Sequence, residues 1–285
     1  MGQNRINILK FSAYLEITRP LNVVISFVAI GVGAILAGPL QPISAVLAAC
    51  VSGALITAAA NTINDVFDVE IDRVNKPLRP LPRNLLGLRE AKIFSGILFV
   101  SGVGCAFFIG YTALMIAAVF SVLLYMYSAY LKRMVIWGNF VVSLATAFAF
   151  IYGGLSVGHP EYALYPALFA FCMHFAREII KDIEDQKGDR QGNANTLAVV
   201  YGIRPGQWLV TLLLTLLAGL TVVPFVTGLY NRYYFWMLLA GVYTVLIYTL
   251  CCIWLRPTVR QMRFVSKLLK ADMLIGLLAL YVGRY

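Results

Sequence analysis

Two groups of three aspartates in this chain share the spacing D-x-x-D-x-x-x-D. They are Asp65, Asp68 and Asp72 in the first acidic motif and Asp182, Asp185 and Asp189 in the second acidic motif. Positions i, i+3 and i+7 lie on one face of a helix, so each motif is expected to present its carboxylates as a column. Carboxylate oxygens suit Mg²⁺, which commonly bridges a few carboxylates and the phosphates of a substrate. The spacing therefore predicts a magnesium and diphosphate site in which all six aspartates are metal ligands and catalytic residues.

A solvated helix end is the simpler explanation for a single acidic run of this kind. Two copies with identical spacing favour a functional site, because a solvated loop has no reason to keep the same register twice. Six like charges near a low-dielectric boundary also repel one another unless cations lie between them. Calcium is a less favoured cation, since the sequence has no twelve-residue EF-hand pattern.

The elements that must position these motifs are helices of membrane-spanning length. Hydrophobic residues make up 60% of the 285 residues and charged residues 13%, and the mean hydropathy is +0.80. Such a composition lies outside the range of soluble domains. Apolar segments of about 17–25 residues cross ~30 Å of hydrocarbon as helices. The predicted fold is all-α: a polytopic membrane protein, one domain over residues 1–285, with nine transmembrane helices in one bundle, near 20–38, 43–64, 93–111, 113–131, 137–157, 162–181, 207–229, 233–254 and 267–283.

Positive charge is distributed unevenly between the two sides of this arrangement. All of the 23 Lys and Arg residues except Arg232 and Arg284 fall on the side that holds the N-terminus and both acidic motifs. Short cytoplasmic loops collect Lys and Arg. We therefore expect a cytoplasmic N-terminus, a C-terminus on the opposite side, and a cytoplasmic cap over a central cavity, formed by loops near 65–92 and 182–206.

The net charge of +10 predicts contact with anionic headgroups of membrane lipids and with an anionic substrate. Nucleic acid is not an expected partner, because no soluble domain or basic-aromatic module is evident. No obligate protein partner is indicated. The five cysteines lie within the expected helices without C-x-x-C spacing, which is typical of buried spectators.

Basic side chains near the motifs are candidates for holding diphosphate oxygens. Arg177 and Lys181 lie four residues apart on the helical face that continues to Asp185. Further candidates on the same predicted side are Lys76, Arg79, Lys132 and Arg133. The alternative for each is a charge that faces lipid headgroups. His174, one turn before Arg177, is expected to be a core histidine with its hydrogen bonds satisfied, and the alternative is a side chain that points into the cavity.

Four segments of the chain resemble the UbiA-type intramembrane prenyltransferases. The segment NDVFDVEID carries the NDxxDxxxD signature at Asn64, Asp65, Asp68 and Asp72, and DQKGD carries the second signature at Asp185 and Asp189. The segments TRPLN, with Arg19 and Asn22, and YSAYLKR, with Tyr127, Lys132 and Arg133, are similar to family segments at the first helix and after the fourth. The segment LPRN, residues 81–84, departs from the family pattern, in which a small residue and Gly follow the proline.

The resemblance spans essentially the whole chain and implies Mg²⁺-dependent transfer of a prenyl group from a prenyl diphosphate to an acceptor. It implies a helical bundle open laterally to lipid, because the isoprenoid tail is soluble only in hydrocarbon. It also adds Asn64, Arg19, Asn22 and Tyr127 to the predicted substrate-binding residues.

In motif detail the chain looks most like the branch that makes archaeal-type ether lipids. That branch transfers geranylgeranyl to geranylgeranylglyceryl phosphate, which implies geranylgeranyl diphosphate as donor and a lipid phosphate as acceptor. An aromatic acceptor, such as 4-hydroxybenzoate or a quinone or chlorophyll-type precursor, is the alternative. A cation-coupled transporter is the alternative from another class, but it would place its acids near the bilayer midplane rather than at segment ends.

Overall fold

The computed structural model describes residues 2–191 and 194–284. Residues 192–193, within the predicted cap segment 182–206, lie outside this description. The chain divides into two compact units. Unit 1 is Met1–Leu131 with Ala149–Pro160, and unit 2 is Lys132–Phe148 with Glu161–Tyr285. All regular structure in the described residues is helical, as the composition predicts.

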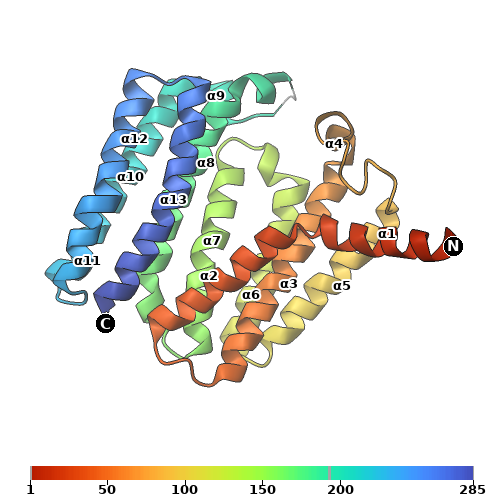
Figure 1. Ribbon diagram of the computed structural model, residues 1–285, viewed down its shortest axis with the longest axis horizontal. Helices are drawn as coiled ribbons and strands as arrows, with labels where there is room; N and C mark the ends of the chain where they lie inside the picture. Colours follow the sequence, from red (N-terminus) through yellow and green to blue (C-terminus); the bar gives the residue numbers. More distant parts are fainter. Residues whose placement is uncertain (1, 192–193, 285) are drawn as a thin grey trace. The chain divides into compact units, whose positions relative to one another are not determined.

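Unit 1 is built around one long central helix. Its helices are α1 (Gly2–Ile17), α2 (Pro20–Ala37), α3 (Ile43–Phe67), α4 (Val69–Asn75), α5 (Leu88–Ala106) and α6 (Tyr111–Ala129), joined by the second part of α7 (Trp137–Ser156). Helices α2, α5 and α6 all pack against α3 (Figure 1). Pro20 occupies the first position of α2, where its missing N–H is not needed for an intrahelical bond.

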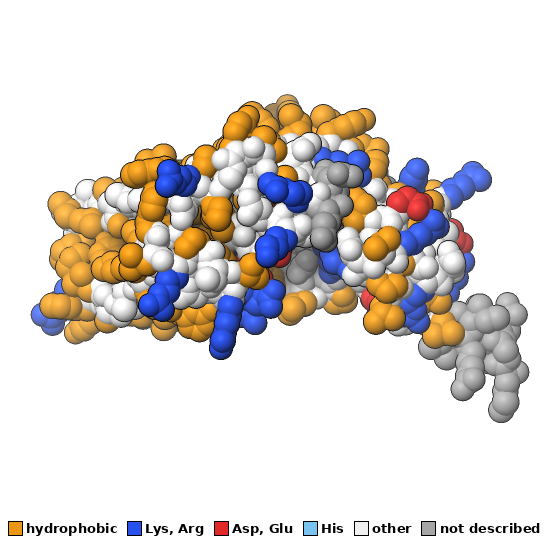
Figure 2. Space-filling model, turned by 90° about the horizontal axis from the view of Figure 1, so that it is seen from above, with side chains coloured by type: hydrophobic (Ala, Val, Ile, Leu, Met, Phe, Trp, Pro, Cys, Tyr) orange, Lys and Arg blue, Asp and Glu red, His pale blue; other side chains and the backbone are white. Residues whose placement is uncertain are grey.

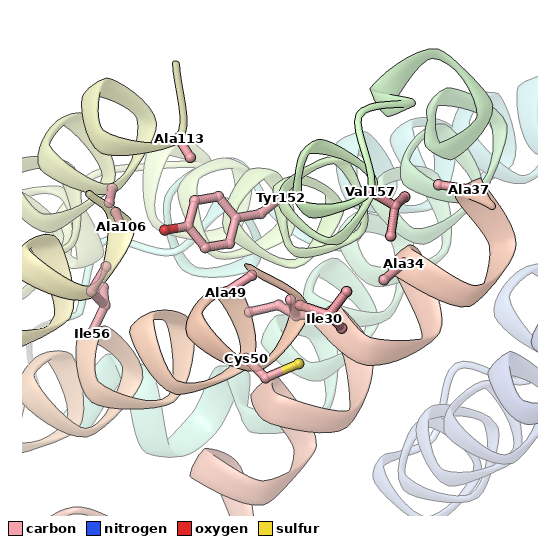
Figure 3. Packing of buried hydrophobic residues seen from close by; sticks show 12 residues of the cluster. Ile30, Ala34, Ala37, Ala49, Cys50, Ile56, Ala106, Ala113, Tyr152 and Val157 are labelled. Carbon is pink, nitrogen blue, oxygen red and sulfur yellow. The ribbon is translucent and has the colours of Figure 1, made fainter. Parts of the chain in front are cut away.

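Small side chains dominate the buried core of unit 1. Figure 3 shows Tyr152 entering this core from α7 among alanines of the neighbouring helices. The hydroxyl of Tyr152 lies 2.8 Å from Oγ of Ser52, and Ser52 in turn donates to the carbonyl of Gly102 at 2.7 Å. The hydroxyls of Tyr152 and Ser52 are therefore paired, which an apolar environment requires.

Helices α2 and α7 approach each other closely at two glycines. A Cβ atom on Gly33 would lie 2.5 Å from the carbonyl oxygen of Phe150, and one on Gly153 would overlap the backbone of Ile30 and Ala34. Backbone atoms cannot move aside as a flexible side chain can. This contact therefore tolerates no larger residue at either position.

Unit 2 is a second helical bundle, in which α8 packs against α10 and α13 (Figure 1). Its elements after the first part of α7 are α8 (Leu164–Gln191), α9 (Leu197–Val200), α10 (Ile203–Val226), α11 (Arg232–Met237), a π-helical turn (Leu238–Val242), α12 (Tyr243–Leu255) and α13 (Val259–Arg284). The side chain of Asn231 caps α11 by accepting hydrogen bonds from the amides of Tyr233 and Tyr234, at 2.9 and 3.3 Å.

Seven stretches of the described residues are long and apolar enough to cross a membrane, so the chain is a multi-pass integral membrane protein. They are Pro20–Ala37, Ile43–Phe67, Tyr111–Ala129, Trp137–Ser156, Pro160–Arg190, Ile203–Val226 and Arg232–Leu255. The other two expected spans, 93–111 and 267–283, fall on α5 and α13, which carry charged residues along part of their length. Nine spans therefore remain a prediction. Figure 2 shows Lys and Arg side chains standing out from a largely apolar and uncharged surface.

Replacing Gly153 by Ala is expected to destabilise unit 1, because the new methyl group meets the backbone of α2. Overpacking of this kind costs about 1–3 kcal/mol. Gly104→Ala in α5 is the matched control, since a Cβ there meets nothing within 4 Å. Thermal unfolding in detergent should show a lowered midpoint for Gly153→Ala and no lowering of the midpoint for Gly104→Ala. Equal midpoints for the two variants would contradict the close approach.

Candidate active site

The first acidic motif spans a break between two helices. Helix α3 ends at Phe67, Asp68 has φ −96° and ψ 0°, and α4 begins at Val69. Backbone hydrogen bonds continue across the break. The amide of Asp68 donates to the carbonyl of Asn64 at 3.0 Å, and the amide of Asp72 donates to the carbonyl of Asp68 at 2.8 Å. The motif therefore lies not on one regular helix but on a helical path with a junction at its middle aspartate, and the shared face of its three carboxylates remains a prediction. An Asp is suited to such a junction because its side chain competes with helical hydrogen bonds.

Two aspartates of this motif share one guanidinium group. Nη1 of Arg79 lies 3.0 Å from Oδ1 of Asp65 and 2.5 Å from Oδ2 of Asp72. Both aspartates are only 3% exposed. Arg19 also donates to Oδ1 of Asp65, and Asn64 donates to Oδ2 of Asp68 at 3.0 Å. The repulsion between these carboxylates leads us to expect cations beside them. Two arginines of the chain, Arg19 and Arg79, are such cations.

The loop after α4, which carries Arg79, is anchored in unit 1 through its apolar residues. Leu81 and Leu86 are 4% exposed and belong to a cluster of buried residues contributed by α1, α3, α4 and α5. Asn84 takes a φ of 56°, in the left-handed region where Asn is among the better-tolerated residues after Gly. This explains how the loop accepts LPRN, since Asn84 stands where the family pattern has Gly.

Arg19 lies at the junction of α1 and α2 with a φ of 53° and a ψ of 73°. Left-handed backbone costs a non-glycine residue about 1–2 kcal/mol. The side chain of Asn61 fixes this junction by donating to the carbonyl of Thr18 at 2.8 Å, and Ile17 beside it is fully buried. Asn61 therefore ties α3 to the turn between α1 and α2.

The second acidic motif lies entirely within α8. Oδ2 of Asp182 accepts a hydrogen bond from Nδ2 of Asn139 at 2.6 Å. Asn139 is in the first part of α7, which belongs to unit 2. This residue could not be predicted from the sequence, because no spacing rule relates an Asn in one helix to an Asp forty-three positions later in another. Gln186 ties the same end of α8 to α9 by donating to the carbonyl of Ala198 at 2.5 Å.

The two cations predicted on α8 share one carboxylate. Nη1 of Arg177 lies 2.6 Å from Oε1 of Glu178, and Nζ of Lys181 lies 3.0 Å from Oε2. Arg177 also donates from Nε to the carbonyl of Ser266 on α13 at 3.3 Å. Glu178 is not among the predicted site residues, although its spacing from Lys181 is that of an ordinary helical ion pair. Nδ1 of His174, on the same helix, is buried and has no hydrogen-bond partner among the described atoms.

The remaining predicted residues lie at helix ends or in turns. Asn22 is exposed in the first turn of α2, and Lys76 is exposed directly after α4. Tyr127 is half-buried in α6, whereas Lys132 and Arg133 belong to a 3₁₀ turn, Leu131–Arg133, at the boundary of the two units. Their roles in substrate binding remain predictions, as does the meeting of the two acidic motifs.

The donor set of the first motif fits a hard divalent cation. Oxygens of Asp65 and Asp72 converge on a single nitrogen of Arg79, so they already surround one cationic point. Oxygen ligands of this type suit Mg²⁺. Within the described residues, no group of three or more His, Cys, Asp or Glu side chains is arranged to hold a metal by itself. Any ion here would take further ligands from elsewhere, such as the oxygens of a diphosphate.

Comparison with known proteins identifies the family. The model of the UbiA prenyltransferase family matches residues 24–273. The digeranylgeranylglyceryl phosphate synthase of Methanopyrus kandleri is 36% identical over 270 residues, which cover 94% of this chain and 97% of that protein. The enzyme of the same name from Saccharolobus solfataricus is 35% identical over 240 residues, or 83% of each chain.

Solved structures agree with this assignment. A structure of digeranylgeranylglyceryl phosphate synthase is 32% identical, with a TM-score of 0.88 over 96% of this chain and 98% of that chain. A UbiA homologue from Archaeoglobus fulgidus, bound to DMAPP and Mg²⁺, is 18% identical and shares the fold, with a TM-score of 0.73 over 94% and 99% of the two chains. The family model and these relatives each cover most of the sequence, and the chain therefore belongs to the UbiA prenyltransferase family.

Proposed function

We propose that this protein transfers a geranylgeranyl group from geranylgeranyl diphosphate to geranylgeranylglyceryl phosphate, in the synthesis of membrane ether lipids. The observation that carries the proposal is the convergence of the Asp65 and Asp72 carboxylates on one cationic point, in a membrane chain that keeps both acidic motifs of its family. Relatives that carry the synthase name and align with more than 80% of this chain favour the lipid acceptor over an aromatic one.

The six aspartates of the two acidic motifs are the proposed metal ligands. Bound Mg²⁺ would act as a Lewis acid that draws charge from the diphosphate and makes it a better leaving group. Asn64 holds Asp68, and Asn139 holds Asp182, so two of the six carboxylates are oriented by amides. An amide orients an anion without competing for it as a full positive charge does.

Arginine and lysine side chains are proposed to bind the diphosphate oxygens as the C1–O bond of the donor breaks. The glycerol hydroxyl of the acceptor forms the new bond to C1 and loses its proton, while the diphosphate leaves with the bonding electrons. Arg79 and Lys76 approach from the loop after α4, and Arg177 and Lys181 lie on α8, one turn or more before Asp185.

The membrane arrangement proposed for this reaction has nine spans, with the N-terminus and the mouth of the site in the cytoplasm. It is supported by the one-sided distribution of Lys and Arg and by the length of α5 and α13, at 19 and 26 residues. The segments 65–92 and 182–206 would cover the mouth and keep water from the allylic cation.

A transfer assay with purified protein in detergent tests the function. Geranylgeranyl diphosphate and geranylgeranylglyceryl phosphate should give a double-chain ether lipid by mass spectrometry, and EDTA should abolish it. The Asp68→Ala/Asp185→Ala variant should lose the product while keeping the thermal midpoint within a few degrees. Turnover with 4-hydroxybenzoate but not with the lipid phosphate would overturn the acceptor, and no transfer to any acceptor would overturn the prenyltransferase assignment.

Asn139→Leu is expected to lower the rate of transfer, because it leaves the Asp182 carboxylate without its amide donor. Loss of a hydrogen bond to a charged group is worth about 1.5–3 kcal/mol, or roughly ten- to a hundredfold in rate if it is expressed at the transition state. Asn139→Gln keeps an amide and should retain more activity than Asn139→Leu. A purely structural role would instead lower the thermal midpoint of both variants equally and leave the Mg²⁺ dependence of the remaining activity unchanged.

A further inference from the structure

Arg79 occupies the position in which the first acidic motif is expected to bind metal. Its Nη1 atom is within 3.0 Å of Asp65 and 2.5 Å of Asp72, and both carboxylates are almost fully buried. A cation that approached the same two oxygens would meet the guanidinium. Metal binding to these carboxylates therefore competes with the Arg79 contacts.

We propose that Arg79 is an exchanging cation: it neutralises the first acidic motif in the metal-free protein, and it moves to the diphosphate when metal and diphosphate load together. The proposal rests on the proposed function, because it assumes that Asp65 and Asp72 bind metal. It also predicts that metal and diphosphate bind together more readily than metal alone. Metal alone must compete with Arg79, whereas a diphosphate that arrives with the metal gives Arg79 a new anionic partner.

The surroundings of Arg79 and Arg19 indicate which arginine exchanges. Arg19 lies between two helices, and its Nε atom is buried without a hydrogen-bond partner among the described atoms. Arg79 lies in a loop, and the residues just before it, Pro77 and Leu78, are exposed. Leu81 anchors the loop two residues after Arg79. Arg79 can therefore swing away from the carboxylates while the rest of the loop stays packed, and Arg19 remains with Asp65.

The electrostatic balance favours such an exchange over simple loss of the contact. Asp65 and Asp72 are too buried to remain charged without a cation, since uncompensated buried charge is strongly unfavourable. A divalent ion supplies more charge than Arg79 removes when it leaves. The free guanidinium then has a planar, bidentate geometry that matches phosphate oxygens.

The test is binding of Mn²⁺, used as a paramagnetic substitute for Mg²⁺ and measured by electron paramagnetic resonance on the full-length protein in detergent. Arg79→Gln should bind Mn²⁺ alone about tenfold more tightly than the unmodified protein, if Arg79 occupies the carboxylates about 90% of the time. Inorganic pyrophosphate should tighten Mn²⁺ binding to the unmodified protein. It should do so less in Arg79→Gln, because that variant lacks the guanidinium that would bind the pyrophosphate.

Arg83→Gln is the matched control. It removes the same charge from the same loop, but its nearest carboxylate is Glu16, at 3.9 Å. Displacement predicts an effect of less than about twofold for this variant, because no motif contact is lost. Equal tightening by Arg79→Gln and Arg83→Gln would overturn the proposal in favour of a general charge effect. Weaker Mn²⁺ binding in Arg79→Gln would also overturn it, because Arg79 would then organise the metal site rather than compete for it.

Arg79→Lys keeps the test decisive if Arg79→Gln does not fold. A single ammonium cannot reproduce the planar guanidinium geometry. The Mn²⁺ affinity of Arg79→Lys should therefore lie between the affinity of the unmodified protein and the affinity expected for Arg79→Gln. An affinity equal to that of the unmodified protein would count against exchange. Failure of the proposed function is a separate result: in that case the unmodified protein binds no Mn²⁺ with or without pyrophosphate. Normal Mn²⁺ binding that is unaffected by Arg79→Gln would overturn only the exchange.

Discussion

The structure depends on partners for the buried carboxylates of its two acidic motifs, in a chain that is mostly apolar. A buried carboxylate without a partner is costly, and removing one partner of a buried pair typically costs about 3–5 kcal/mol. Asp65 and Asp72 are buried and are met by Arg19 and Arg79. In unit 2 a different solution is seen, in which the amide of Asn139 holds Asp182. Each motif is therefore stabilised within its own unit before any ligand is considered.

This constraint accounts for the local structure around the first motif. Arg19 takes a left-handed backbone conformation at the end of α1, and Asn61 secures that turn from α3. The loop after α4 brings Arg79 back to the helix it has just left and is anchored by Leu81 and Leu86. Arg79, which neutralises the first acidic motif without ligand, is also one of the residues proposed to bind the diphosphate. On that proposal, stability and substrate binding depend on the same charge.

The sequence was sufficient for the parts of the fold that depend on composition and local spacing. Membrane-length apolar segments predicted the helical class, and seven of the nine predicted spans correspond to helices apolar enough to cross a membrane. The other two spans, in α5 and α13, carry charged residues, so length and composition do not confirm them. The repeated D-x-x-D-x-x-x-D spacing located both motifs, and the family match supports the prenyltransferase assignment made from them.

Contacts between residues far apart in the chain could not be predicted from the sequence. The role of Asn139 depends on which helices pack together, and this residue belongs to no recognisable pattern. The pair of Glu178 with Lys181, in contrast, has the i, i+3 spacing of a helical ion pair and could have been predicted. The pairing of Arg79 with Asp65 and Asp72 requires the loop after α4 to fold back. The break at Asp68 was missed because the spacing i, i+3, i+7 suits a regular helix equally well.

The central claim is that the two acidic motifs bind metal and diphosphate together. Anomalous scattering from Mn²⁺, in crystals grown with an unreactive thiodiphosphate analogue of the prenyl donor, tests it most directly. The account predicts Mn²⁺ peaks at coordination distance from carboxylates of both motifs, with the diphosphate oxygens between them. Mn²⁺ bound by one motif alone, with the diphosphate elsewhere, would contradict it.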